Sequence, residues 1–372
     1  MRSKWVLAMA MAAAVALPGV SFAAKAADKP APMTGLYGVN VSGSIAGGFL
    51  YDSNRPAPAA GLGSQVSGRA FDVKDYQFSL QLAKLVLQKD ATVGKPGFNI
   101  ALAFGSTADL VAAAEPAGAE VYKHVEQAYV EMKKVLLGRE VTVDFGKFVT
   151  QHGAEVIEIQ DNWNLSQGFL FTSAIPFYHA GVRATTDLMA GVTGQLNITN
   201  GWNNVVDNNL GKTIGVQLVG NNMPVWWTVN WMGGPEAPNN SGMRSLIDVV
   251  AGGAVPVMKD MDWKANYDFG SDTGTGAGAV AGNWTGLALF LRKNMDPCAV
   301  AVRYEVYTDN TTGGAMGGGS TGNTLSSYTA TLEHKEMGGM LSRLEVRHDV
   351  ATAAVVGVKS QTTYSWGLVQ TF

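Results

Sequence analysis

Apolar and polar residues alternate in short stretches along most of the chain. In the first clear stretch, one side is formed by Val39, Val41, Ile45, Phe49 and Tyr51. In the second, the apolar side is formed by Tyr76, Phe78, Leu80 and Leu82, and in the third by Phe98, Ile100, Leu102 and Phe104. A period of two over about ten residues is typical of a membrane strand with one face in lipid and the other in a polar lumen.

The same pattern recurs to the end of the chain and predicts about sixteen strands, an even number as closed bacterial barrels require. The stretch 243–252 has the weakest pattern, and losing one hairpin would leave about fourteen strands. The further strands are expected at 121–136, 139–148, 176–189, 190–199, 211–220, 224–232, 243–252, 260–270, 283–293, 297–308, 324–334, 338–348 and 361–372.

Long and short connections alternate between these strands. The short ones lie near Gly94, Leu137-Gly138, Met189-Ala190, Asn221-Asn222, Asn294-Met295 and Lys335-Glu336. The long ones are 52–70, 106–120, 149–175, 200–210, 233–242, 271–282, 309–323 and 349–360. Because every second connection is long, all short turns lie at one end of the barrel, and both termini lie at that end, as in a transmembrane antiparallel β-barrel. A soluble sandwich or β-helix could alternate too, but would not need such sorting.

The last strand bears on closure of the sheet, because a final strand has no later partner unless it pairs with the first. Tyr364, Trp366 and Leu368 share the side of the terminal Phe372, which we expect to be the aromatic residue that closes the barrel at its lipid-facing rim. Tryptophans near strand ends favour aromatic girdles at the membrane interfaces; the candidates are Trp226, Trp227, Trp231, Trp263, Trp284 and Trp366.

Composition supports one large all-β domain in an exported protein. The chain has 372 residues, of which 47% are hydrophobic and 15% charged, with 45 Gly and a net charge of -3. Residues 1–23 are expected to be a signal peptide, with Arg2 and Lys4 before an apolar segment and Ser21-Phe22-Ala23 as its cleavage site, which leaves 24–372 as the barrel domain. Cys298 is the only cysteine, so no internal disulfide can form.

If the apolar face points to lipid, the charged residues fall inside the barrel. The basic ones, expected to line the pore, are Arg183, Lys264, Arg292, Arg303, Arg343 and Arg347. The acidic ones are Asp75, Glu131, Asp144, Asp268, Glu305, Glu333 and Glu345. They could equally form cross-strand ion pairs with no role in selectivity.

The long connection 149–175 is acidic and less rich in glycine than the others. We expect it to fold into the lumen and face the basic wall, so that Glu155, Glu158 and Asp161 form the acidic side of a pore constriction. The alternative is an ordinary external loop.

One region resembles a known family. The motifs are Gly146-Lys147-Phe148, Gly153-Ala154-Glu155, Asn162, Pro176-Phe177-Tyr178-His179, Gly181-Val182, Asn200-Gly201-Trp202 and Asp207-Asn208. They resemble the β-barrel porin family described as OmpL-like, over about residues 120–230. The resemblance implies a bacterial outer-membrane channel and transfers no binding residue.

No pattern for catalysis or cofactor binding was found. The five histidines are scattered without metal-ligand spacing, and His179 or His348 beside a serine would be the only proposal for an enzyme. We therefore predict a porin for passive diffusion of small hydrophilic solutes or ions, without cofactor, and a non-conducting adhesin or assembly scaffold as the alternative. The expected partners are outer-membrane lipids, the solutes and the barrel-assembly machinery, with a homotrimer left open and no nucleic acid.

Overall fold

The computed structural model describes residues 33–34, 38–54, 65–115, 122–221, 224–276, 279–355 and 357–372. The expected signal peptide, residues 1–23, lies outside these ranges.

Sixteen long strands follow one another through the described residues. They are β2 (Asn40–Asp52), β3 (Gln77–Lys89), β4 (Gly97–Phe104), β5 (Val125–Leu136), β6 (Arg139–Val149), β7 (Tyr178–Met189), β8 (Val192–Thr199), β9 (Thr213–Gly220), β10 (Val225–Gly234), β11 (Arg244–Ala254), β12 (Met261–Asp272), β13 (Gly282–Met295), β14 (Cys298–Asp309), β15 (Asn323–Lys335), β16 (Met340–Val355) and β17 (Val358–Thr371). The shorter elements are β1 (Met33–Thr34), α2 (Ser106–Ala113), η3 (Ile159–Asp161), η4 (Leu170–Ala174), η5 (Thr312–Gly314) and η6 (Met337–Gly339).

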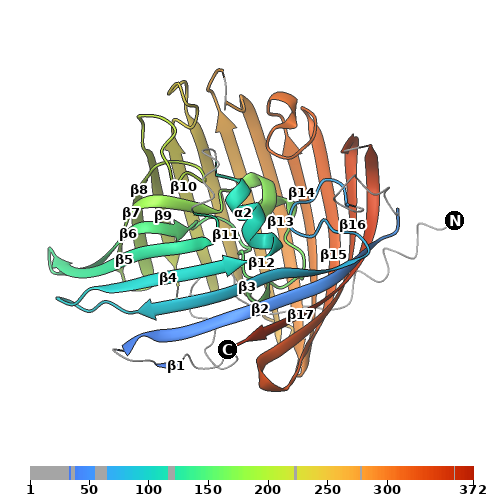
Figure 1. The fold of residues 1–372 in the computed structure, drawn as a ribbon, viewed down its shortest axis with the longest axis horizontal. Helices are drawn as coiled ribbons and strands as arrows, with labels where there is room; N and C mark the ends of the chain where they lie inside the picture. The colour runs from blue at the N-terminus through green and yellow to red at the C-terminus, as the bar shows by residue number, and fades with distance from the viewer. Residues whose placement is uncertain are drawn as a thin grey trace.

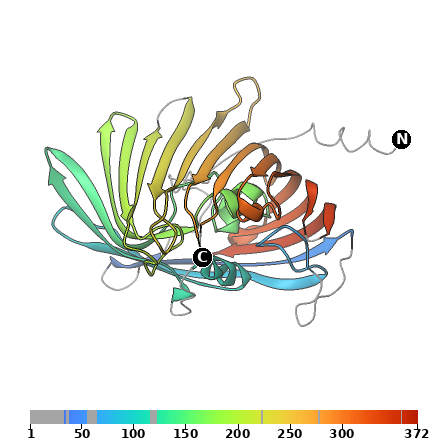
Figure 2. The ribbon, with the colours of Figure 1, turned by 90° about the horizontal axis from the view of Figure 1, so that it is seen from above.

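Each long strand pairs in antiparallel fashion with its neighbours in the chain, and β17 pairs with β2, so the sheet closes into a barrel. Figures 1 and 2 show the strands standing side by side around a central space. At the seam, Phe372 donates its N–H to the Gly43 oxygen and accepts the N–H of Gly43, both at 3.0 Å. The prediction of a sixteen-stranded closed barrel is confirmed, and the uncertain strand at 243–252 is β11.

The outer face is apolar, as the alternation predicts. Phe78 is 79% exposed and Leu344 55%, and other exposed aliphatic and aromatic side chains follow on nearly every strand. A water-exposed band of this extent would be unfavourable, whereas lipid accommodates it. The predicted inward charged residues have buried or half-buried side chains on the opposite face.

One strand departs from the expected alternation. Leu82, expected on the lipid side with Leu80, is fully buried inside the barrel. The pairing of β2 with β3 shifts at this point, because Ala46 faces Leu82 whereas Gly47 faces Leu80, leaving Gln81 as an extra residue. Since such a bulge inserts one residue, every later side chain of β3 changes face.

The connections sort by length as predicted, except for the last. The expected long connection 349–360 is mostly strand, because β16 runs to Val355 and β17 begins at Val358. Val350 and Val355 are separated by an irregularity in the pairing with β17. The alternation of exposed and partly buried residues continues through 351–355, which explains why the hairpin extends beyond the predicted strand ends.

Candidate pore and its inner loop

The connection between β6 and β7, residues 150–177, lies inside the barrel; we call it the inner loop. It includes η3 and η4, and Figure 2 shows this green segment within the ring of strands. Its polar contacts fall mainly on the inward faces of β12–β16, which we call the docking wall. Backbone buried in this way needs a hydrogen-bond partner for each N–H and C=O group, and the wall provides many of them.

Carboxylates accept hydrogen bonds from the backbone N–H groups of the inner loop. Glu345 of β16 accepts from Leu165 at 2.6 Å and from Ser166 at 3.1 Å. Glu305 of β14 accepts the N–H of Phe169 at 2.6 Å. Within the loop, Glu155 accepts the N–H of Gly168 at 2.8 Å. An ionised acceptor makes a stronger hydrogen bond than a neutral one, so these contacts fix the path of residues 165–169.

Arginines of the docking wall donate hydrogen bonds to the backbone carbonyl oxygens of the inner loop. Arg303 donates to the Ser166 oxygen at 2.6 Å. Arg347 donates to the Gln167 oxygen at 2.7 Å. Arg343 donates to the oxygens of Ile159 at 2.5 Å and Asn162 at 2.9 Å. The fixed fork of donors in guanidinium suits this task, because one side chain can bond several groups in a plane.

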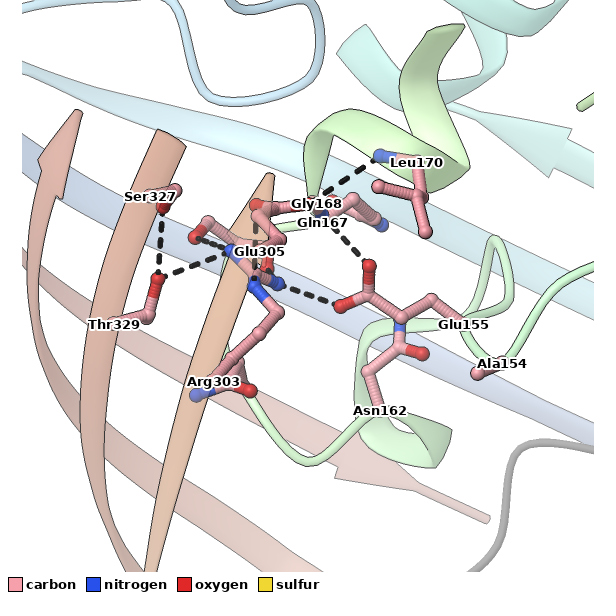
Figure 3. Close-up of polar contacts among 12 residues, drawn as sticks. Ala154, Glu155, Asn162, Gln167, Gly168, Leu170, Arg303, Glu305, Ser327 and Thr329 are labelled. Atoms are coloured by element: carbon pink, nitrogen blue, oxygen red, sulfur yellow. Dashed lines mark hydrogen bonds and ion pairs between the residues drawn. The ribbon is translucent and has the colours of Figure 1, made fainter. Parts of the chain in front are cut away.

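The same arginines form ion pairs with buried carboxylates. Arg303 lies 2.6 Å from Glu155 and 3.4 Å from Glu305, and Figure 3 shows its contact with Glu155. Arg343 pairs with Glu333 at 2.6 Å and Arg347 with Asp349 at 2.8 Å. Each of these charges thus has an opposite charge beside it, which offsets the cost of removing both from water.

The expectation that these arginines form an open basic surface is corrected by their burial. Arg303 is 2% exposed, and Arg343 and Arg347 are each 1% exposed. They lie between the inner loop and the wall rather than on a water-filled surface. Lys264 is also buried and donates to the Ala154 oxygen, and Arg292 pairs with Glu333.

The remaining predicted site residues lie elsewhere. Glu158 of the inner loop pairs with Lys84 of β3, which also contacts Glu126 of β5. Arg183 of β7 pairs with Asp144 at 2.8 Å and keeps some exposure to solvent. Asp161, at the end of η3, is half-buried. The structure therefore does not bring Glu155, Glu158 and Asp161 to a single point.

Apolar side chains complete the docking of the inner loop. Trp163, Phe169 and Phe171 belong to one buried cluster with Trp284 and Phe290 of β13. Trp284 is fully buried and donates its indole N–H to the Ala174 oxygen at 3.0 Å, so it is not part of a lipid-facing girdle as expected. Trp226 also packs against this inner cluster.

Two glycines of the barrel, one in the docking wall and one on the neighbouring β17, lie against leucines of the inner loop. A Cβ atom built on Gly367 of β17 would lie 2.5 Å from Leu165 Cδ1. One built on Gly286 of β13 would lie 2.7 Å from Leu170 Cδ1. Only glycine leaves room for such close packing at these two positions, so the two leucines fit into notches of the barrel on β13 and β17.

Two further connections enter the barrel, which the sequence did not lead us to expect. Phe71, after β2, packs on Phe171 and Phe177, with ring centroids 5.6 Å apart in both pairs. The helix α2 contacts β3 and β4 and buries Ala108 and Val111. Large apolar residues within connections otherwise rich in small polar ones are the signal that could have identified these segments.

Two buried histidines lie where the inner loop meets strands β6 and β7. Thr150 Oγ1 lies 3.0 Å from His152 Nδ1 and 3.1 Å from His179 Nε2. His179 Nδ1 lies 3.1 Å from the Gly201 oxygen, so this nitrogen carries the proton. Burial, and to a smaller extent His179, lowers the pKa of His152 well below its ordinary value. These contacts support a structural role for His179.

A cavity of about 320 Å³ remains beside the inner loop. Its lining comes from β2, β3 and β17, from α2, from residues 70–74 and from Leu165 and Ser166. Ser166, whose carbonyl oxygen accepts a hydrogen bond from Arg303, is part of this lining.

The family called "Putative beta-barrel porin-2, OmpL-like" matches residues 38–372. The chain belongs to this family. It is an outer-membrane channel protein of the porin type, and the apolar outer band of the barrel is the surface that contacts lipid. A search of curated proteins gives no match.

Solved outer-membrane proteins share the fold of this porin at low sequence identity. The anion-selective porin from Comamonas acidovorans is 12% identical with a TM-score of 0.59, covering 90% of this chain and 99% of that one. The outer membrane channel DcaP of Acinetobacter baumannii is 11% identical with a TM-score of 0.59, covering 92% and 100%. The trimer form of OmpT from Vibrio cholerae is 10% identical with a TM-score of 0.55, covering 90% and 99%.

Among the described residues, no helix is long and apolar enough to cross a membrane. That part of the chain also holds no group of three or more His, Cys, Asp or Glu residues placed to bind a metal ion.

Proposed function

We propose that this porin is a narrow channel for passive diffusion of small hydrophilic solutes or ions, with the inner loop setting its width. The observation that carries the proposal is the attachment of residues 155–169 to the docking wall by Arg303, Glu305 and Glu345. A loop held by so many charge-assisted bonds reduces the open cross-section permanently, unlike a loop that rests loosely on the surface.

The predicted constriction residues divide between two roles in this proposal. Glu155 is buried beside Arg303 and holds the inner loop in place. Glu158 and Asp161 are half-buried and, with Arg183, supply the charges that solutes meet. The field in the open part of the lumen would then depend on these half-buried groups rather than on the buried arginines.

The proposal includes no catalytic step. His179 is bonded to Thr150 and Gly201, and His348 Nδ1 lies 2.8 Å from Thr362 Oγ1. Neither contact is to a serine. Replacing either histidine would therefore alter stability without removing a hydrolytic activity.

We also propose that the porin assembles as a homotrimer in the outer membrane. The support is the trimer form of the structurally similar OmpT. Phe372, paired at the barrel seam and partly exposed, would be the residue read by the barrel-assembly machinery. Crosslinking in native membranes would test the first statement, and a Phe372→Ala variant with reduced insertion the second.

Planar-bilayer recordings of the purified mature protein test the central proposal. Stable open steps, together with swelling of liposomes in small sugars or amino acids, are expected. A barrel that inserts fully but never conducts would contradict the proposal and favour the scaffold function. Resistance of the inserted barrel to protease would serve as the control for correct folding.

A further inference from the structure

Two carboxyl groups meet inside the barrel on the neighbouring strands β11 and β12. Asp248 and Asp268 are directly opposite in the pairing of these strands, and both are 0% exposed. Their carboxyl groups are hydrogen-bonded to each other; we call them the acid pair. Because two ionised carboxylates have no hydrogen to donate, a bond between them requires a proton on one of the two.

The surrounding donors distinguish the two members of the acid pair. Asp248 accepts hydrogen bonds from the side-chain amides of Asn230 and Asn266, the latter at 2.7 Å, and from the N–H of Gly153. Asp268 is contacted by the Asn266 amide at 3.4 Å, and its buried Oδ2 meets no donor among the described residues. Since a buried carboxylate needs donors at its oxygens, Asp248 is the member that can be ionised, and Asp268 is the member that can carry the proton.

No basic side chain among the described residues forms an ion pair with the acid pair. The residues paired with it on β10 and β13, Asn230 and Gly286, are uncharged. A second negative charge at this place would therefore have no cation beside it to offset its burial. The titratable groups nearby on the packed elements are bound elsewhere: Arg244 by Asp272, Lys264 by the Ala154 oxygen, Glu155 and Glu305 by Arg303, Tyr307 by the Met316 oxygen, Asp309 by the Gly318 N–H, and His152 by Thr150.

The acid pair is bonded to the start of the inner loop. Gly153 donates its N–H to Asp248, and Ala154 donates its N–H to Asn266 Oδ1 at 2.9 Å. Asn266 also donates to both carboxyl groups, so its orientation depends on their spacing. Loss of the proton would leave two negative charges in contact inside the barrel, and their repulsion would break this arrangement.

We propose that Asp248 and Asp268 share one proton, and that the acid pair holds the start of the inner loop until alkaline medium removes this proton. The proton passes to hydroxide in the lumen, the two carboxylates separate, and Gly153 and Ala154 leave the barrel wall. The attached form binds one proton more than the released form, so the attachment weakens as the pH rises. This response is opposite in sign to that of His152, whose pKa is lowered by burial. The proposal goes beyond the channel function and does not depend on conduction.

The shared proton is tested by infrared spectroscopy of the folded barrel. A protonated carboxyl group has a C=O stretching band that a carboxylate lacks. The difference spectrum between the parent and Asp268→Asn should contain this band at neutral pH, and alkaline medium should remove the band from the unmodified parent. Asp262→Asn, at a half-buried carboxyl of the same strand, should retain the band as the matched control.

Two results would overturn the shared proton. One is a difference spectrum without the band, which would mean that both carboxyl groups are ionised at neutral pH. The other is a parent spectrum that does not change between neutral and alkaline medium. The second result needs no variant, so it decides the question even if Asp268→Asn fails to fold.

The release of the inner loop is tested with a thiol at Ala154, which is 1% exposed. Cys298→Ser gives a cysteine-free parent, and Ala154→Cys adds the only thiol. Its rate of labelling by a methanethiosulfonate reagent is divided by the rate in the same protein with Asp268→Asn, whose amide donates to Asp248 at every pH. The ionisation of the thiol and of Lys264 cancels in this ratio. Once the proton is lost, the ratio should rise by up to about tenfold for each pH unit.

A ratio that stays constant or falls through the alkaline range would overturn the release, even where infrared spectra show the shared proton. Amide hydrogen exchange at Gly153 and Ala154, compared between the unmodified protein and Asp268→Asn, gives the same ratio without a thiol. It decides the question if Ala154→Cys disturbs the fold. Neither measurement uses conductance, so a failure of the proposed channel function would leave both results interpretable.

Discussion

The docking wall and the adjoining strands β17, β2 and β3 differ in the chemistry of their inward positions, although both follow the same strand alternation. Around the inner loop, β14 and β16 present arginines and glutamates that are almost fully buried. Beside it, β17, β2 and β3 present glycine, serine and glutamine around a cavity, and Lys84 of β3 where Glu158 of the inner loop is bound. Charge inside this barrel therefore marks where a segment is bound, whereas small uncharged residues mark where space remains.

Removing Arg303 should have the largest effect on this contrast. Arg303→Ala leaves Glu155 and Glu305 buried without their shared cation, which typically costs about 3–5 kcal/mol. We expect the free energy of unfolding in lipid vesicles to fall by this amount and the conductance steps to become larger and noisier. Unchanged steps and stability would show that the inner loop does not depend on the docking wall.

Adding a side chain at Gly367, where Leu165 packs against the barrel, should lower the free energy of unfolding by a smaller amount. Gly367→Ala would place a Cβ atom 2.5 Å from Leu165 Cδ1, and overpacking of this kind typically costs about 1–3 kcal/mol. Urea titration followed by tryptophan fluorescence should show the loss. Combining it with Leu165→Ala should recover part of it, because the two substitutions share one contact. Strict additivity in the double variant would argue against the notch.

Acidification should destabilise the protein where the inner loop leaves β6. The pKa of His152 is lowered by burial below its ordinary value of 6.5, so below that pH the unfolded chain binds a proton that the folded chain excludes. The contribution of neutral His152 to the free energy of unfolding is therefore fully present above about pH 6.5. It declines, by at most about 1.4 kcal/mol per pH unit, as the pH falls toward the pKa of His152 in the folded protein. His152→Gln should flatten this slope between pH 7 and pH 5 in equilibrium unfolding. A slope equal to that of the parent would assign the pH dependence to other groups.

The ion pair of Arg183 and Asp144 should have the smallest effect on stability. Its two side chains are 17% and 7% exposed. Because glutamine keeps an N–H donor for the Asp144 carboxylate, Arg183→Gln should lower the free energy of unfolding by only about 1 kcal/mol. It should nevertheless move the reversal potential in a salt gradient toward cation preference, since one positive charge of the lumen is lost. A stability loss as large as that of Arg303→Ala would show that Arg183 is as important to the fold as the arginines that bind the inner loop.

Much of the barrel could be predicted from the sequence because its constraint is local. Each strand needs one face for lipid, and Phe98, Ile100 and Phe104 show that face directly. The bulge at Gln81 was missed because the apolar residues on either side of it, at 80 and 82, continue the alternation without a break. The bulge shows in which positions face outward. Before it, the exposed Phe78 has an even number, and after it, the exposed Leu85 has an odd number.

The site was harder to predict because its contacts connect distant parts of the chain. Arg303 and Glu155 are 148 positions apart, and alternation can show only that Arg303 faces inward. Whether an inward arginine meets water or a buried carboxylate depends on the path of residues 150–177. For the same reason Trp284 could be placed near a strand end but not on the side that packs against the inner loop.

The width of the channel with and without the inner loop is the most direct measure of its role. A variant in which residues 156–174 are replaced by a short Gly-Ser linker should insert as a barrel and give single-channel steps at least about twice as large as the intact protein, with weaker discrimination between solutes. Steps of the same size and selectivity from both proteins would contradict the account, because the inner loop would then not limit the pore.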